Sequence, residues 1–169
     1  ATSSIPTANG VTGNYNVTAT VGALTPATFA LTNTAGAAQT ITATAGTPQS
    51  TAINTAFGVA LQARVTDASS NPVANVTVTF TAPVTGASAS FGGSNTTTAV
   101  TNASGIATSS IPTANGVTGN YNVTATIGAL TPATFALTNT AGTPQTITAT
   151  AGTPQSAAIN TAFGVALQA

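Results

Sequence analysis

Length, composition and charge exclude several classes of protein. The chain has 169 residues, of which only 1% are charged, whereas about 25% are charged in an average soluble domain. Because Arg64 and Asp67 are the only charged side chains, electrostatic binding to nucleic acid or to an acidic membrane is excluded. Polar residues also interrupt every apolar run well before the roughly 18 residues of a membrane-spanning helix, so this segment is not expected to enter a membrane.

The first strands are predicted from apolar residues that recur with a period of two. Residues 39–45 alternate in this way, and the following Gly, Thr and Pro at 46–48 break the pattern. A second strand is predicted over residues 57–66, with Arg64 turned outward and alternate apolar residues turned inward: Phe57, Val59, Leu61, Ala63 and Val65. Residues 67–72 then form a turn, since Asp and Asn bind nearby backbone and Pro fixes φ.

The chain beyond this turn continues the same pattern. Strands are predicted at residues 76–81, 87–91, 96–101, 106–111 and 119–127, and at a final segment that carries Phe135 and Leu137. The sequence does not decide which face of the strand at 106–111 is buried. No window shows the 3.6-residue period of a helix. The chain is therefore predicted to be all-β, an antiparallel β-sandwich of immunoglobulin-like form.

The sequence also repeats itself. Residues 107–169 match residues 1–63 at an offset of 106 (107 − 1), and four pairs differ: Val21/Ile127, Ala37/Thr143, Ala38/Pro144 and Thr51/Ala157. A period of this length is one domain, because solenoid repeats run at about 20–50 residues.

The repeat predicts tandem domains. Residues 39–144 are a complete domain, 1–38 the C-terminal part of a preceding one and 145–169 the N-terminal part of a following one. The two end segments together lack the positions of 64–106, so they do not make a further whole domain. In the parent protein the residues after Ala169 are expected to read Arg-Val-Thr-Asp, as they do after Ala63.

Three motifs carry a resemblance to a known family. Residues 67–80 (DASSNPVANVTVTF), 101–107 (TNASGIA) and 119–125 (GNYNVTA) are similar to signatures of bacterial immunoglobulin-like domains of the invasin and intimin type (group 1). The resemblance implies a sandwich of about seven to nine strands, in a tandem rod displayed on a bacterial surface. Two positions depart from the family pattern, with Ser70 in place of Gly and Asn102 in place of Asp.

No catalytic, cofactor-binding or metal-binding residues are expected. Asp67 has no His, Cys, Lys or Glu to act with, and the many Ser and Thr have none to activate them. One Asp per period also falls far short of the roughly six to eight oxygen ligands of Ca²⁺. Asp67 is instead expected to cap its turn. Arg64 and Asp67 lie three apart on an extended chain, which does not require them to pair.

Several polar and aromatic residues allow two readings. Tyr121 and Tyr15 are expected to be tyrosine corners whose hydroxyls bind nearby backbone, with ligand stacking as the alternative. Bare or glycosylated side chains are both open for the asparagines of N-x-S/T triplets: Asn16, Asn75, Asn95, Asn102 and Asn122. The Thr-x-Thr ladders at 77–81 and 146–150 suit solvated strands, and the alternative is an ice-binding surface.

The function expected from these features is structural. The chain is interpreted as a segment of an extracellular bacterial fibre or surface stalk, not an enzyme, with an adhesin module for a host glycan, receptor or ice as the alternative. Its expected partners are neighbouring repeats and other copies of itself, and a glycan on Thr or Asn is left open. Other copies are expected to associate side by side. Because the chain has almost no charged side chains, this lateral association should hardly change with salt concentration between about 10 mM and 1 M. Many weak contacts along the array should share the binding, so no single side chain should dominate it.

The links between domains carry a mechanical expectation. They fall at residues 34–39 and 140–145, and Pro144 stiffens the second because it fixes φ and biases the preceding residue toward an extended conformation. The first has Ala37 and Ala38 at the corresponding positions and is expected to be looser.

Overall fold

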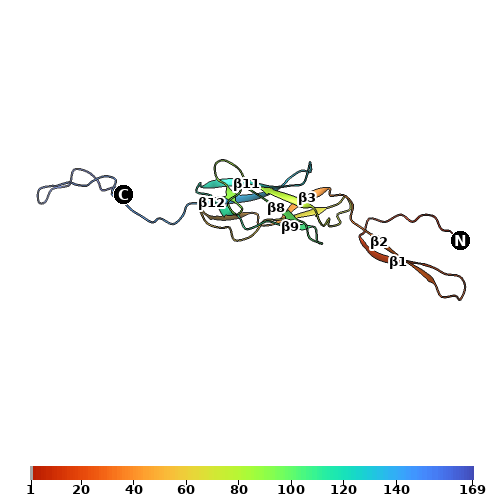
Figure 1. Ribbon diagram of the computed structural model, residues 1–169. Coiled ribbons are helices and arrows are strands. Elements are labelled where there is room, and N and C mark those ends of the chain that lie inside the picture. Colours follow the sequence, from red (N-terminus) through yellow and green to blue (C-terminus); the bar gives the residue numbers. More distant parts are fainter. Residues whose placement is uncertain (1) are drawn as a thin grey trace.

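The computed structural model describes residues 2–169, which form strands and turns but no helix. None of these residues therefore forms a helix suited to crossing a membrane. Figure 1 shows an elongated molecule with a hairpin at the N-terminal end, a sandwich in the middle and an extended segment at the C-terminal end. The strands in chain order are β1 Gly13–Ala19, β2 Ala27–Asn33, β3 Thr40–Ala45, β4 Gln49–Ala52, β5 Gln62–Thr66, β6 Thr77–Thr81, β7 Ala89–Ser90, β8 Thr96–Val100, β9 Ile106–Thr108, β10 Thr113–Ala114, β11 Gly119–Thr126 and β12 Ala133–Thr140.

Two sheets build the sandwich. One has the order β4-β12-β11-β6-β8, the other has the order β3-β5-β9, and β7 pairs separately with β10. The all-β prediction is thereby confirmed, together with the sandwich in its general form. One pair departs from the predicted antiparallel pattern: at one edge β4 pairs in parallel with β12, from Gln49 opposite Leu137 to Ala52 opposite Thr140.

The break between β3 and β4 explains this parallel pair. The chain runs along the small sheet in β3 and then crosses to the large sheet in β4. Gly46 makes the crossing possible, since its φ is +83° and a Cβ there would lie 2.7 Å from the carbonyl oxygen of Ala60. The polar sequence of β4 shows no alternation, so pattern reasoning found only a kink here.

The core lies between the two sheets. Inward residues of β6, β11 and β12 are buried, with Tyr121 half-buried among them, and the rings of Phe80 and Phe135 meet at a centroid distance of 5.9 Å and an angle of 53°. Burying each such side chain stabilises the fold by about 1.5–3 kcal/mol. The largest fully buried aliphatic and aromatic side chains come from both sheets and the loops between them: Phe80, Phe135, Leu61, Leu137, Val65, Val78 and Val123.

The strand predicted over residues 57–66 is shorter than expected. It begins at Gln62 as β5, and Val59 is 51% exposed although the alternation placed it in the core. The side-chain amide of Gln49 explains the difference, because it donates to the carbonyl of Val59 at 2.9 Å and accepts from its N–H at 3.2 Å. A side chain thus satisfies the backbone of Val59, which needs no neighbouring strand.

The segment at 106–111 was also predicted as a longer strand. The structure ends β9 at Thr108, and the inward residues of this stretch are Ala107 and Ser109. Ser109 continues the pairing by hydrogen bonds to Leu61, whose N–H donates to the serine hydroxyl at 3.1 Å. The short strand expected at 87–91 is reduced to the two residues of β7.

The two hairpins whose paired strands have identical sequences have the same register but different surroundings. Tyr15 lies opposite Leu31 in β1–β2, as Tyr121 lies opposite Leu137 in β11–β12. Phe29 is nevertheless 55% exposed, whereas its counterpart Phe135 is 0% exposed. Local sequence therefore produces the hairpin, and burial of its apolar face requires the rest of the sandwich.

Candidate functional site

The turn that follows β5 has the hydrogen bonds expected of an Asp cap. The Oδ1 atom of Asp67 accepts bonds from the backbone N–H groups of Ser69 and Asn71, both at 2.9 Å. The prediction that Asp67 caps this turn is confirmed. Ser70 has a φ of 65°, in the left-handed region that favours glycine.

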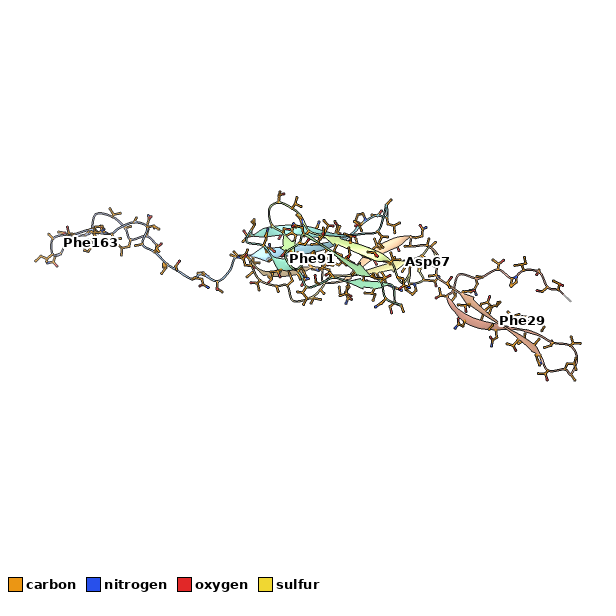
Figure 2. All side chains as sticks on the ribbon, viewed as in Figure 1. Phe29, Asp67, Phe91 and Phe163 are labelled. Carbon is orange, nitrogen blue, oxygen red and sulfur yellow. The ribbon has the colours of Figure 1, made fainter. Side chains whose placement is uncertain are left out.

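The same turn also binds the N-terminal part of the chain. Oδ2 of Asp67 accepts the backbone N–H of Gly36 at 2.9 Å, and the side-chain amide of Asn71 donates to the carbonyl of Gly10 at 2.9 Å. Figure 2 shows Asp67 at the end of the sandwich that faces the hairpin carrying Phe29. We call this contact between the 67–71 turn and residues 10 and 36 the joint.

Packing and a neighbouring backbone bond support the joint. Ala35 and Ala38 pack against the core, and the N–H of Gln39 donates to the carbonyl of Thr66 at 2.9 Å, one residue before β3 begins. A hollow of about 260 Å³ lies beside the Asp67 carboxylate and is lined mostly by small and polar residues. The relative looseness expected of the Ala37–Ala38 link stays a prediction, but this link has a specific contact that chain stiffness alone did not suggest.

The single carboxylate is buried and held in its charged form. Asp67 is 8% exposed. The hydrogen bond from the N–H of Gly36, and next the bond from the Asn71 side chain, hold the pKa of Asp67 below its ordinary value of 3.8. None of its hydrogen-bond partners, Gly36, Ser69 and Asn71, can titrate. The joint therefore depends on one ionised group with a fixed set of backbone and amide donors.

Acid should open the joint. Because the pKa of Asp67 is lower in the folded state, its contribution is complete above pH 3.8 and is lost as the pH falls below that value. The Asp67→Asn variant should show the open joint at neutral pH, with exchange of the Gly36 amide proton accelerated about tenfold. NMR measurement of amide exchange at Gly36, in both proteins and across pH 2–6, about the ordinary Asp range, checks this.

The matched control for Asp67→Asn is Arg64→Gln. It also changes the net charge by one unit, but Arg64 is exposed on β5 and takes no part in the joint. Gly36 exchange should therefore stay at the wild-type rate in Arg64→Gln. Equal acceleration of Gly36 exchange in both variants would contradict the role of Asp67. So would protection of the Gly36 amide that does not change as the pH is lowered.

A second polar cluster lies inside the sandwich around Asn139. Its side chain is 1% exposed and donates to the carbonyls of Ser88 and Val117 at 2.9 and 3.1 Å and to Oδ1 of Asn115 at 3.0 Å. The hydroxyl of Tyr121 donates to Oδ1 of Asn139 at 3.1 Å. Every hydrogen-bonding atom of this amide side chain is thus engaged, which is what burial of a polar group requires.

The tyrosine-corner expectation is corrected by this contact. Tyr121 was expected to bind nearby backbone, but its hydroxyl binds a side chain on the paired strand, because Asn139 lies diagonally from it, two residues beyond its partner Leu137 on β12. Burial raises the pKa of Tyr121 to about 12, so the hydroxyl stays protonated as a donor. Tyr15, at the same position of the first hairpin, is 39% exposed.

Sequence reasoning missed this amide cluster, although a signal was present. Asn139 occupies an inward position of β12 after Phe135 and Leu137, where the alternation calls for an apolar residue. The first hairpin has the equivalent of one bond of this cluster, since the amide of Asn33 donates to Oδ1 of Asn9 at 2.9 Å, as that of Asn139 does to Oδ1 of Asn115. An asparagine at an inward position of the alternation, present in both copies, therefore indicates a structural hydrogen-bond cluster.

The triplet asparagines fall mostly on the surface. Asn95 is the half-buried one, and its amide donates to the carbonyl of Pro83 at 2.8 Å. Asn102 caps its own turn as Asp67 does, by accepting from the N–H groups of Ser104 and Ile106. The others are exposed: Asn16, Asn75 and Asn122. Attachment of glycans to these side chains stays an open alternative.

The threonine ladders differ in exposure. Within 77–81, Thr77 is exposed and Thr79 and Thr81 are half-buried in β6, whereas 146–150 belongs to the C-terminal segment, where Ile147 is 85% exposed. Thr79 and Thr81 also lie between β11 and β8. This reduces the outward threonine surface that an ice-binding reading of 77–81 needs.

Chemically, the joint can bind backbone but has no partner for proton transfer. Both oxygens of Asp67 already accept hydrogen bonds, and the sequence holds no second acid and no His. General acid–base catalysis needs a group that can exchange a proton with a substrate. In comparisons with known proteins, no protein-family model matches the sequence and no curated protein matches it.

Proposed function

We propose that the chain is a segment of an extracellular bacterial fibre or surface stalk, built from near-identical immunoglobulin-like domains in tandem and without catalytic chemistry of its own. In this proposal residues 39–144 are one domain, 1–38 belong to the preceding domain and 145–169 to the following one. The motifs at 67–80, 101–107 and 119–125 support the immunoglobulin-like assignment of the invasin and intimin type.

The observation that carries the proposal is the separation of two hairpins with the same strand sequences. Hairpin β11–β12 completes the sandwich, whereas β1–β2 lies outside it, beyond the joint (Figure 1). The C-terminal segment repeats the sequence of β3 and, apart from Ala157 in place of Thr51, that of β4, and it extends from the opposite end. Copies that follow one another along a line are what a rod of tandem domains needs.

Local structure in the C-terminal segment gives the proposal further support. The amide of Gln155 donates to the carbonyls of Gly152 and Val165, both at 2.8 Å, as Gln49 does to the carbonyls of Gly46 and Val59. The turn that starts one domain therefore recurs at the corresponding point of the next period.

Solution scattering of the chain tests the rod. A compact chain of this length has a radius of gyration of about 15 Å, and an extended arrangement should clearly exceed that value and give the scattering profile of a rod. A value near the compact one would contradict the proposal. Tight, saturable binding of the chain in a glycan array, or arrest of ice growth, would instead place the function in a binding surface.

A further inference from the structure

The edges of the two sheets differ in how well they are protected against a further strand. The outer strands are β4 and β8 in the large sheet and β3 and β9 in the small one. An outer strand presents a row of unpaired N–H and C=O groups that can pair with another chain, and proteins normally protect it by shortness, a bulge, a proline or a charge.

Three of these edges have such protection. The small-sheet strand β3 has a register shift between Ala43 and Ala45, and β9 has only three residues and lies directly beside Arg64. The other large-sheet edge, β4, has only four residues, and the side chain of Gln49 at its start is hydrogen-bonded to Val59 in the adjoining loop.

Strand β8 has none of these protections. Its five residues pair with β6 in an unbroken register, from Val100 opposite Thr77 to Thr96 opposite Thr81. It contains no charge, no proline and no glycine. Thr96 and Thr98 are exposed and Val100 is 59% exposed, so the outer face is uncharged and lined with methyl groups.

We infer that β8 is the surface through which two copies of this chain associate laterally, by antiparallel pairing of β8 with β8 of the second copy. An antiparallel strand is complementary to itself, so a two-fold axis can join identical edges. With all five residues paired, Thr98 faces its own counterpart and Thr96 faces Val100. The chain has zero formal net charge, and no long-range repulsion opposes the approach.

This inference rests on the proposed function, because a single five-residue contact is weak. Along an array, every period presents the same edge, and simultaneous contacts raise the effective concentration of each one. Main-chain hydrogen bonds would supply the binding, which agrees with the expectations that salt has little effect and that no single side chain dominates.

A charge swap at Thr98 tests the pairing and its register. Thr98→Lys and Thr98→Glu each place like charges directly opposite in the two-fold pair and should weaken self-association about fivefold or more. An equimolar mixture of the two should restore it to the wild-type level or above. Sedimentation at millimolar chain concentration measures association, and amide exchange of residues 96–100 should slow as concentration rises.

The control is the same swap on the bulged edge strand β3. Thr42→Lys and Thr42→Glu carry the same charges at an exposed position and should associate as the wild type does. The inference would be overturned if the Thr42 variants lost association or if Thr98→Lys associated as the wild type does. A wild-type chain that does not associate would overturn it as well. A strictly monomeric chain that still scatters as a rod would refute the β8 contact and leave the proposed fibre intact.

Discussion

Replacing Phe135 with alanine should destabilise the sandwich by about 3–5 kcal/mol. The ring is fully buried and packs against Phe80 at 5.9 Å, so truncation leaves a cavity between the sheets. A domain of this size has only about 5–15 kcal/mol of stability, and the loss should be visible as a large decrease in the denaturant midpoint. Urea unfolding followed by circular dichroism or tyrosine fluorescence measures it.

The repeat supplies an unusually close control in Phe29→Ala. Phe29 lies between the same neighbours, Thr and Ala, in a strand of identical sequence and register, but it is 55% exposed. Intrinsic strand preference and unfolded-state effects are therefore matched, and only burial differs. The main unfolding transition should shift little in Phe29→Ala, and equal shifts in the two variants would show that the hairpins are not placed as described.

The Gly105→Ala substitution should be the second large effect, at about 2–5 kcal/mol. Gly105 has a φ of +72°, and a Cβ there would lie 2.5 Å from the carbonyl oxygen of Val65 and 3.1 Å from Cβ of Pro72. The left-handed backbone costs a non-glycine residue about 1–2 kcal/mol, and the clash with packed backbone adds about 1–3 kcal/mol. Equilibrium unfolding of the variant gives the value.

Gly86→Ala separates these two contributions. Its φ is also +72°, but nothing lies within 4 Å of the position that a Cβ would take. This variant should lose only the backbone contribution of about 1–2 kcal/mol. If Gly105→Ala costs no more than Gly86→Ala, the close approach between Gly105 and the end of β5 is not a constraint on the fold.

Gly105 also shows which features of a turn can be predicted from its local sequence. The sequence predicts a turn at residues 102–105 from its Asn and Gly, and Asn102 indeed caps it. The clash that makes glycine necessary comes from Val65 and Pro72, which are remote in sequence. The turn was therefore predictable, whereas the reason for its most constrained residue lay in another part of the chain.

The same division applies to the joint. Asp67 was predicted to cap its own turn because the donors at Ser69 and Asn71 are two and four residues away. Its bond to Gly36 spans 31 residues, and no local pattern announces it. The parallel strand β4 is similar, since its pairing with β12 joins segments that only the folded topology brings together.

The sequence by itself determined the period of 106 residues, the strand faces of β6, β11 and β12, and the turns at 67–72 and 102–105. These follow from alternation and from hydrogen bonds between near neighbours, which are written into short stretches of chain. Tertiary structure alone decided that Phe135 is buried and Phe29 is not. Their neighbours are identical, so no local rule can tell them apart. Burial depends on the strands around a residue: β4 and β6 flank β11–β12 in the large sheet and the small sheet packs against it, whereas β1–β2 form a separate two-stranded sheet.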